Sequence, residues 1–146
     1  MNYLADSNLW LRYSQPADPQ FPAALHALSA AAQRKDVLHL MPQTVSEYWR
    51  VATGTVRGGF GWTPALADGR VALLEARFPL LPDTPDVYRH WRRIVRDFSV
   101  SGGQVYDARL VAAMLAHGMT HLVTFNTADF TRYASLGIVA LHPQEM

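Results

Sequence analysis

The sequence of 146 residues has no cysteine, a single lysine and no long apolar segment. Without cysteine the chain cannot form a disulfide, a thiolate nucleophile or a cysteine-ligated zinc or iron–sulfur centre. No apolar run approaches the roughly 20 residues that a membrane-spanning helix needs. The first residues, MNYLAD, lack the basic and then apolar layout of a signal peptide. We therefore expect a cytoplasmic protein without membrane contact.

The charges that are present are nearly balanced, at 13 basic against 12 acidic residues. All basic residues except Lys35 are arginine, whose planar guanidinium binds phosphate in a bidentate manner. If four acids gather at one site, the rest of the surface carries surplus positive charge, which favours a polyanionic partner. A coding bias toward arginine and alanine is the alternative explanation of this composition.

Apolar residues make up 49% of the chain, enough to bury one core, and no linker or repeat is visible. We expect one domain over residues 1–146. Short apolar segments alternate with helical periodicity, which predicts an α/β fold with a central parallel sheet of four to five short strands flanked by helices. The glycine-rich segment 54–63 is predicted to be a loop. The expected strands are residues 3–5, 37–41, 78–81, 121–124 and 138–141, and the expected helices begin near residues 7, 19, 43, 64, 85 and 105.

Two acidic residues follow predicted strands, at the edge where open parallel sheets bind their ligands. Asp6 comes directly after the first strand, and Asp129 lies five residues beyond Thr124. A helix N-cap is the alternative role for Asp6, and an Asx turn is the alternative for Asp129. Ser7 or Asn8 could hydrogen-bond Asp6, and Thr124 and Asn126 could contact water or phosphate.

Two further acids lie on predicted helices. Asp107 shares a helix face with the apolar Leu110 and Val111, where a carboxylate is costly unless it is paired or metal-bound. An N-cap is again the alternative for Asp107. Glu47 points away from the apolar stripe of its helix, so a solvated surface position also explains it. Together the four carboxylates predict a ring around Mg²⁺ or Mn²⁺, hard cations that prefer oxygen ligands.

Other catalytic arrangements find no support in the residues. The six histidines show no metal-ligand spacing, and no phosphate-binding glycine loop or GxSxG element occurs. A receiver-like domain would need a lysine near its aspartate, but Lys35 lies in an early helix. A haloacid-type phosphatase would need DxD where the chain has Asp6-Ser7-Asn8. Three arginines near the acids are candidate phosphate contacts, with a solvated surface charge as the alternative for each: Arg50, Arg57 and Arg109.

The segments LADSNLWL, SEYWRV, YDARLVAAM and LVTFNTADF, in this order and separation, resemble the PIN-domain nucleases and most of all the VapC-type toxins of toxin–antitoxin pairs. The resemblance covers essentially the whole chain. It implies a three-layer α/β/α fold and a metal-dependent endoribonuclease. It places Asp6, Glu47, Asp107 and Asp129 on the four acidic positions of the family, and Thr124 and Asn126 on its polar fourth motif.

The same resemblance implies a homodimer and inhibition by a cognate antitoxin protein. Four tryptophans are more than a core of this size usually needs, so one or two are candidates for an interface, although all four could equally be buried. An inactive domain of the same fold that only binds RNA or protein is the alternative to the enzyme.

Overall fold

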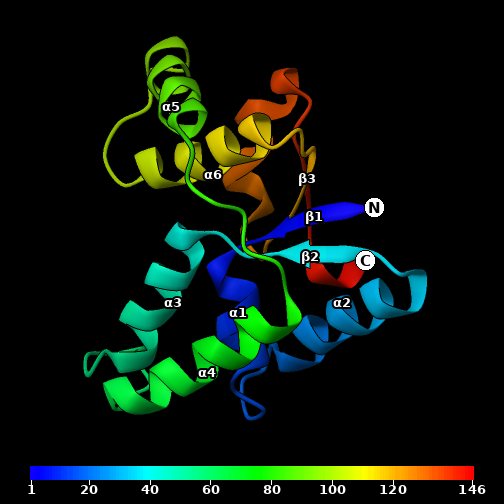
Figure 1. Cartoon of the computed structure of the whole chain (residues 1–146), viewed down its shortest axis with the longest axis vertical. Coiled ribbons are helices and arrows are strands. Elements are labelled where there is room, and N and C mark those ends of the chain that lie inside the picture. The colour runs from blue at the N-terminus through cyan, green and yellow to red at the C-terminus, as the bar shows by residue number, and fades with distance from the viewer.

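Four parallel strands form the centre of the protein, in a computed structural model that describes residues 1–146 (Figure 1). The strands are β1 (Asn2–Ala5), β2 (Val37–His39), β3 (His121–Val123) and β4 (Val139–Leu141). Their spatial order is β2-β1-β3-β4, so the chain leaves β1 toward one side of the sheet and later returns on its other side. The predicted α/β class with a parallel sheet of four to five short strands is confirmed.

Helices cover both faces of this sheet, as buried parallel strands require. One apolar cluster joins side chains of β1 and β2 to helices α1 to α4, and the second joins Leu4 and Leu122 to α5, α6 and η1. Figure 1 shows these two layers on either side of the strands. The helices are α1 (Ser7–Tyr13), α2 (Phe21–Arg34), α3 (Pro42–Thr53), α4 (Pro64–Arg77), α5 (Pro85–Asp97), α6 (Gln104–Ala116) and the 3₁₀ segments η1 (Thr127–Leu136) and η2 (Pro143–Glu145).

The predicted strand at residues 78–81 is wrong, because only one parallel bridge forms there, between Leu40 and Leu80. Pro79 and Pro82 have no backbone N–H, so the segment offers few donors for a ladder. Its remaining bonds to the sheet run from the Leu40 N–H to the Pro79 carbonyl, at 2.9 Å, and from the Leu81 N–H to the Leu40 carbonyl, at 2.8 Å.

The predicted loop at residues 54–63 is confirmed, and its glycines serve a close backbone contact. A Cβ atom on Gly59 would lie 2.2 Å from the carbonyl oxygen of Gly54, which no other residue could accommodate without a shift. The Gly61 N–H donates to that same carbonyl at 2.9 Å. The loop therefore folds back against the end of α3 rather than extending into solvent.

The tryptophans give no support for an interface, since none of the four is exposed. Trp10 is fully buried, and Trp49, Trp62 and Trp91 are half-buried against the two apolar clusters. The indole N–H of Trp91 donates to the Val105 carbonyl at 2.9 Å. None of the helices combines the length and apolar character needed to cross a lipid bilayer.

Candidate active site

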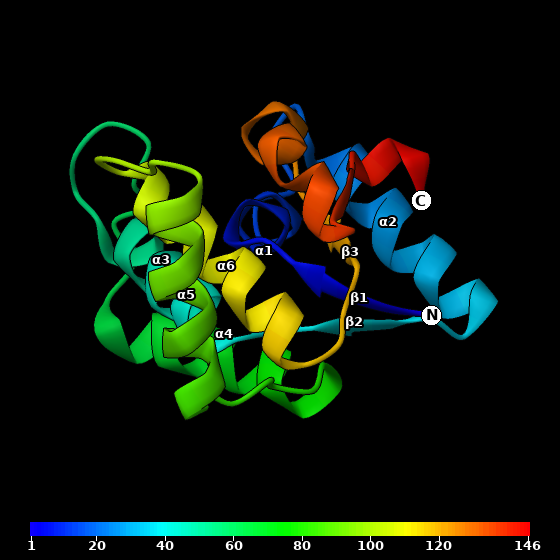
Figure 2. The same ribbon diagram turned by 90° about the horizontal axis from the view of Figure 1, so that it is seen from above.

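The carboxyl ends of β1 and β3 place the first two polar groups of the site side by side. Asp6 directly follows β1, and its N–H donates to the Val123 carbonyl on β3 at 3.0 Å. Thr124 directly follows β3, and its N–H donates to the Leu141 carbonyl on β4 at 3.0 Å. Because the chain order reverses between β1 and β3, these ends form the switch point at which such sheets bind ligands. Figure 2 shows β1 running from the N-terminus toward this edge and α1.

Asp6 is held in a fixed orientation by hydrogen bonds to both of its carboxylate oxygens. Oδ1 accepts from the Ser7 N–H at 2.7 Å and from the Ser7 hydroxyl at 3.3 Å. Oδ2 accepts from the Thr124 hydroxyl at 2.7 Å and from the Asn8 amide at 3.1 Å. Asp6 is thus the N-cap of α1, which confirms the alternative role predicted for it. The residue is only 7% exposed. Capping and a role in the site are therefore compatible.

A small polar network around Thr124 supports this carboxylate. The Thr124 hydroxyl accepts from the Asn8 amide at 3.1 Å and from the Asn126 N–H at 3.0 Å. The Asn8 carbonyl oxygen accepts from the Phe125 N–H at 3.2 Å, which ties the segment after β3 to α1. The Asn126 side chain itself is exposed and makes no hydrogen bond. Asn8 and Thr124 are therefore positioning residues for Asp6.

Glu47 is not a solvated surface residue, because it is half-buried and bonded on both oxygens. Its Oε2 accepts from the Ser7 hydroxyl at 2.8 Å, and its Oε1 accepts from the Gln43 amide at 2.8 Å. Ser7 thereby bridges the carboxylates of Asp6 and Glu47. Gln43 also donates to the Tyr106 carbonyl at 2.9 Å, which links α3 to the first turn of α6.

Asp107 lies in the first turn of α6, whose N-cap is Gly103, so Asp107 is not a capping residue. Burial, together with the nearby charges of Asp6, Asp129 and Glu47 in that order of size, raises the pKa of its carboxyl from 3.8 to about 6. Burial also raises the pKa of Asp6, opposed by the Thr124 hydrogen bond and reinforced by Glu47. The four predicted acids are therefore brought into one electrostatic cluster.

Asp129 occupies the outer side of this cluster. The alternative role of Asp129, an Asx turn, is wrong, because its side chain accepts no hydrogen bond; the residue lies near the start of the 3₁₀ segment η1, and its N–H donates to the Asn126 carbonyl at 3.1 Å. Its side chain is exposed, unlike that of Asp6. Asp129 nevertheless lies close enough to raise the pKa of Asp107 by charge repulsion.

None of the four acids forms an ion pair, although most other aspartates of the chain do. Their donor set consists of oxygens alone, as Mg²⁺ and Mn²⁺ prefer. No three of them are arranged as ready ligands of one ion. Because carboxylates without a cation repel one another, binding an ion would draw the side chains together. The chemistry of the cluster fits a divalent metal, and its present geometry is open.

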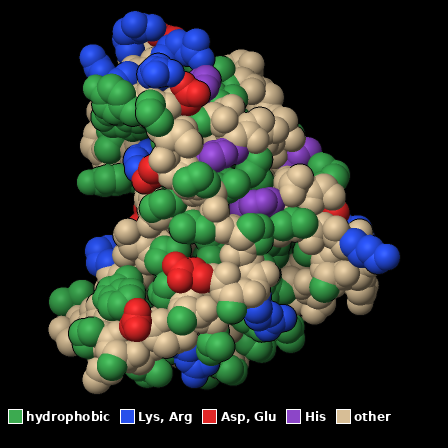
Figure 3. Space-filling view, in the orientation of Figure 1, with side chains coloured by type: hydrophobic (Ala, Val, Ile, Leu, Met, Phe, Trp, Pro, Cys, Tyr) green, Lys and Arg blue, Asp and Glu red, His purple; other side chains and the backbone are tan.

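A cleft of about 600 Å³ lies beside the cluster, between α1, α3 and the start of α6. Glu47, Arg50 and Tyr106 line it together with Ser7 and Gln43. Figure 3 shows the surface hollowed between the part that holds α5 and the part that holds α3 and α4. Of the four acids only Glu47 lines the cleft, and Arg50 is its one basic side chain.

The three predicted arginines are placed differently. Arg50 is exposed and lines the cleft. Arg109 pairs with Asp83 at 2.9 Å and donates to the Gln43 side-chain oxygen at 3.2 Å, so part of its charge is already matched. Arg57 lies in the exposed loop after α3, makes no hydrogen bond or ion pair, and does not line the cleft.

Two residues of the site were not predicted from the sequence. Gln43 precedes Glu47 by four positions on α3, a spacing that places both on one helix face and that could have indicated the contact. Tyr106 is 60% exposed beside Asp107, and no pattern in the sequence distinguishes it from a surface tyrosine. Both depend on how α3 and α6 meet.

Comparison with known proteins agrees with this architecture. The sequence model of the PIN domain family matches residues 3–136 of this chain. The structure of VapBC-1 from nontypeable Haemophilus influenzae is similar, with a TM-score of 0.70, 17% identity and 98% of each chain covered. VapBC2 from Rickettsia felis, bound to a DNA fragment from its promoter, has a TM-score of 0.68 and 10% identity, covering 97% of this chain and 98% of that one.

A third similar structure is VapC20 from Mycobacterium tuberculosis, described as a sarcin–ricin loop cleaving toxin. It has a TM-score of 0.64 and 17% identity, and the match covers 94% of this chain and 96% of that one. At these identities the structures establish a shared fold. A search among curated proteins gave no match.

Proposed function

Because the chain belongs to the PIN-domain family, we propose that it is a metal-dependent endoribonuclease that acts as the toxin of a toxin–antitoxin pair. The observation that carries this proposal is the cluster of Asp6, Glu47, Asp107 and Asp129 at the switch point of the sheet. The charges of three of these acids raise the pKa of the fourth, and none has a cationic partner. Such a cluster binds a divalent cation and, with it, a phosphodiester.

Asp6 and Asp107 are the proposed primary ligands of Mg²⁺ or Mn²⁺, and Glu47 and Asp129 complete the set or orient water. A bound divalent ion would supply an activated water and neutralise charge that develops on the phosphate. Asp6 contributes a carboxylate whose orientation is fixed by four hydrogen bonds. Glu47 is aimed into the cleft by Ser7 and Gln43, so it can accept a proton from a water positioned there.

Arginine side chains bring the substrate to this negative site. Arg50 lines the cleft next to Glu47 and can pair with a phosphate that flanks the cut bond. Arg109 reaches the same region through Gln43, and a phosphate would compete with Asp83 for it. Arg57 lies in the exposed loop after α3 and, unlike Arg50, does not line the cleft. Because such contacts release counterions, RNA binding is expected to weaken as salt increases.

The proposed partners are a cognate antitoxin and a second copy of the chain. Support comes from the similar structures, which include VapBC-1 and VapBC2 and a toxin–antitoxin complex from Klebsiella pneumoniae. Co-expression with the product of the adjacent gene, followed by light scattering of the purified protein, tests both partners. A monomer that neither retains nor is inhibited by that product would contradict this part of the proposal.

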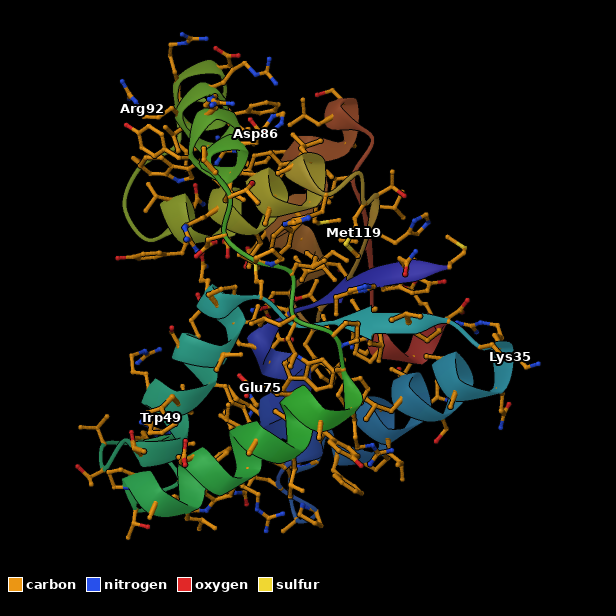
Figure 4. The ribbon with its side chains drawn as sticks, viewed as in Figure 1. Lys35, Trp49, Glu75, Asp86, Arg92 and Met119 are labelled. Carbon is orange, nitrogen blue, oxygen red and sulfur yellow. The ribbon has the colours of Figure 1, made fainter.

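The enzyme is tested by incubating the purified chain with total cellular RNA and mapping the new RNA ends. Cleavage is expected with Mg²⁺ or Mn²⁺ and not with EDTA. Glu47→Gln should reduce it strongly, whereas Glu75→Gln on α4 (Figure 4), which removes the same charge from an exposed residue that does not line the cleft, should not. RNA binding without cleavage in any metal would identify an inactive binding domain instead. Cleavage that survives EDTA and Glu47→Gln would contradict the mechanism.

A further inference from the structure

Four arginines form one continuous stripe along α5. Arg89, Arg92, Arg93 and Arg96 follow one another at spacings of three, one and three residues, which places them on a single helix face. All four are exposed, and the opposite face packs into the core through Val87 and Ile94. Figure 3 shows the resulting group of basic side chains at the end of the molecule that α5 forms. Figure 4 shows Arg92 pointing away from the body of the protein.

The stripe is unfavourable for the helix that carries it. Like charges three or four positions apart destabilise a helix, and every member of the stripe has such a neighbour. Only Arg89 and Arg96 pair with carboxylates, those of Asp86 and Asp97, and both pairs are exposed. Exposed pairs of this kind contribute little and exchange readily with other anions. The stripe is therefore available to a polyanion.

The two central arginines have no carboxylate partner at all. Arg92 makes no hydrogen bond, and Arg93 contacts only the Nδ1 atom of His90, at 3.1 Å. They are consequently the members of the stripe whose removal changes binding to a phosphate without breaking an ion pair. Substitutions at Arg92 and Arg93 therefore test the stripe.

An exposed aromatic residue lies between the stripe and the cleft. Tyr88 is 61% exposed and precedes Arg92 by one helical turn. Its ring lies 6.2 Å from that of Trp91, and both rings line a pocket of about 290 Å³ together with Arg109. Arg109 links this pocket to the cleft, because it donates to Gln43, which lines the cleft and donates to Glu47.

From this arrangement we infer that α5 is a second RNA-binding surface, which holds single-stranded RNA outside the cleft. The arginine stripe binds phosphates of the flanking strand, and Tyr88 stacks on an unpaired base between the stripe and Arg109. Basic side chains that follow the backbone, combined with an aromatic face for bases, are the general means of binding single strands. The inference rests on the proposed ribonuclease function and adds how the substrate is held.

The arginine stripe is tested by RNA binding in the Asp6→Asn background, which prevents cleavage. The probe is a 20-nucleotide, fluorescein-labelled RNA of random sequence, titrated at several salt concentrations. Arg92→Gln combined with Arg93→Gln should weaken binding about tenfold at low salt. It should also lower the slope of log K against log salt by about 1.4, roughly 0.7 for each lost phosphate contact. Circular dichroism should show α5 intact, because the substitutions relieve repulsion.

The matched control removes the same charge from α4. Arg70→Gln combined with Arg77→Gln alters two exposed arginines on a helix that does not border α5. It should leave the affinity and the salt slope close to those of the parent. An equal loss in the two double variants would show that only overall charge matters, and would overturn the stripe as a specific surface.

The stacking contact is tested at Tyr88 alone. Tyr88→Ala should weaken binding about fivefold or more, since stacking on an aromatic side chain typically contributes at least that factor per base. Tyr88→Phe should restore it, because the ring face is kept. A duplex RNA of the same length should be insensitive to Tyr88→Ala. Equal binding of both RNAs, with no effect of Tyr88→Ala, would overturn the stacking contact.

Failure of this inference and failure of the proposed function give different results. If the chain with Asp6 intact cleaves RNA, and the Arg92, Arg93 and Tyr88 substitutions made in that chain leave binding and cleavage unchanged, the second surface is wrong and the nuclease stands. If that chain never cleaves but these variants lose RNA binding, the surface stands and the nuclease falls. If the variants lose an acidic protein partner rather than RNA, the surface serves that partner and the inference is overturned.

Discussion

Asp6 and Asp36 lie at opposite ends of the sheet, and their carboxylates have different surroundings. Asp36 precedes β2, its side chain is 8% exposed, and it pairs with both the terminal amine of Met1 and the guanidinium of Arg34. Those partners hold its pKa below the usual range. Asp6 follows β1, is more deeply buried than Asp36, has no cationic partner, and has a raised pKa. Asp36 is thus neutralised by cations of the chain itself, whereas no cation of the chain pairs with Asp6.

The contrast with Asp36 shows that the fold keeps a buried carboxylate without a counter-charge at Asp6. Burying a carboxylate without a counter-charge is costly, and the hydrogen bonds from Ser7, Asn8 and Thr124 offset only part of that cost. The chain has ion pairs elsewhere, so their absence around the four acids is a local property of the site. A divalent cation would supply the missing charge.

The largest expected effect is on RNA cleavage, which should depend on Asp6 and not on Asp36. Asp6→Asn and Asp107→Asn should each reduce RNA cleavage at least about a hundredfold, because each removes a proposed metal ligand, and such ligands contribute several kcal/mol to the transition state. Asp36→Asn should leave the cleavage rate unchanged. Full activity in Asp6→Asn, measured on the same RNA substrate, would show that the unpaired acids are not the catalytic centre.

A smaller effect is expected from the residue that orients Asp6. Thr124→Val keeps the shape of the buried side chain but removes the 2.7 Å hydrogen bond to Asp6. Loss of such a supporting contact typically reduces metal affinity or activity by about 10- to 100-fold. Mn²⁺ titration and cleavage assays measure both quantities. Thr131→Val, which alters an exposed threonine of η1, is the control and should behave as the parent.

Asp107 and Asp36 should change the stability of the protein with pH in opposite directions. The pKa of Asp107 is raised in the folded state to about 6, so its contribution to stability is present at acidic pH and is lost as pH rises through about 6. The pKa of Asp36 is lowered, so its contribution is present above the usual aspartate pKa and is lost as pH falls below it.

Thermal unfolding in EDTA measures this difference. The Tm of the metal-free protein should fall as pH rises from about 4 to about 6, and Asp107→Asn should flatten that fall. Saturating Mn²⁺ should raise Tm most at the higher pH, where the carboxylates are ionised and free to bind it. A metal-free Tm that is the same across this range in the parent and in Asp107→Asn would contradict the raised pKa.

The smallest expected effect is on stability alone. Asp36→Asn removes a pair that ties the start of β2 to the first residue and to α2, so Tm should fall by a few degrees. Asp6→Asn should leave the metal-free Tm unchanged or raise it, because it removes a buried charge without a partner. If instead Asp6→Asn destabilised the metal-free protein more than Asp36→Asn, the contrast between the two ends would fail.

The sequence predicted the parts of the site that depend on strand ends. Asp6 and Thr124 could be placed because each directly follows a parallel strand, and such ends share one edge. The role of Gln43 could not be predicted, since it requires α3 to meet the start of α6. The strand at residues 78–81 was wrongly predicted from its apolar residues. The prolines of this region have no N–H group to donate, so only one bridge to the sheet forms there.

The most direct test of the central claim is the anomalous scattering of a crystal grown with Mn²⁺. A manganese ion is expected within about 2.0–2.3 Å of carboxylate oxygens of Asp6 and Asp107, with Glu47 and Asp129 drawn toward it. No ion should bind near Asp36. A crystal of active protein in which Mn²⁺ is absent from Asp6 and Asp107, or lies elsewhere on the molecule, would contradict the claim.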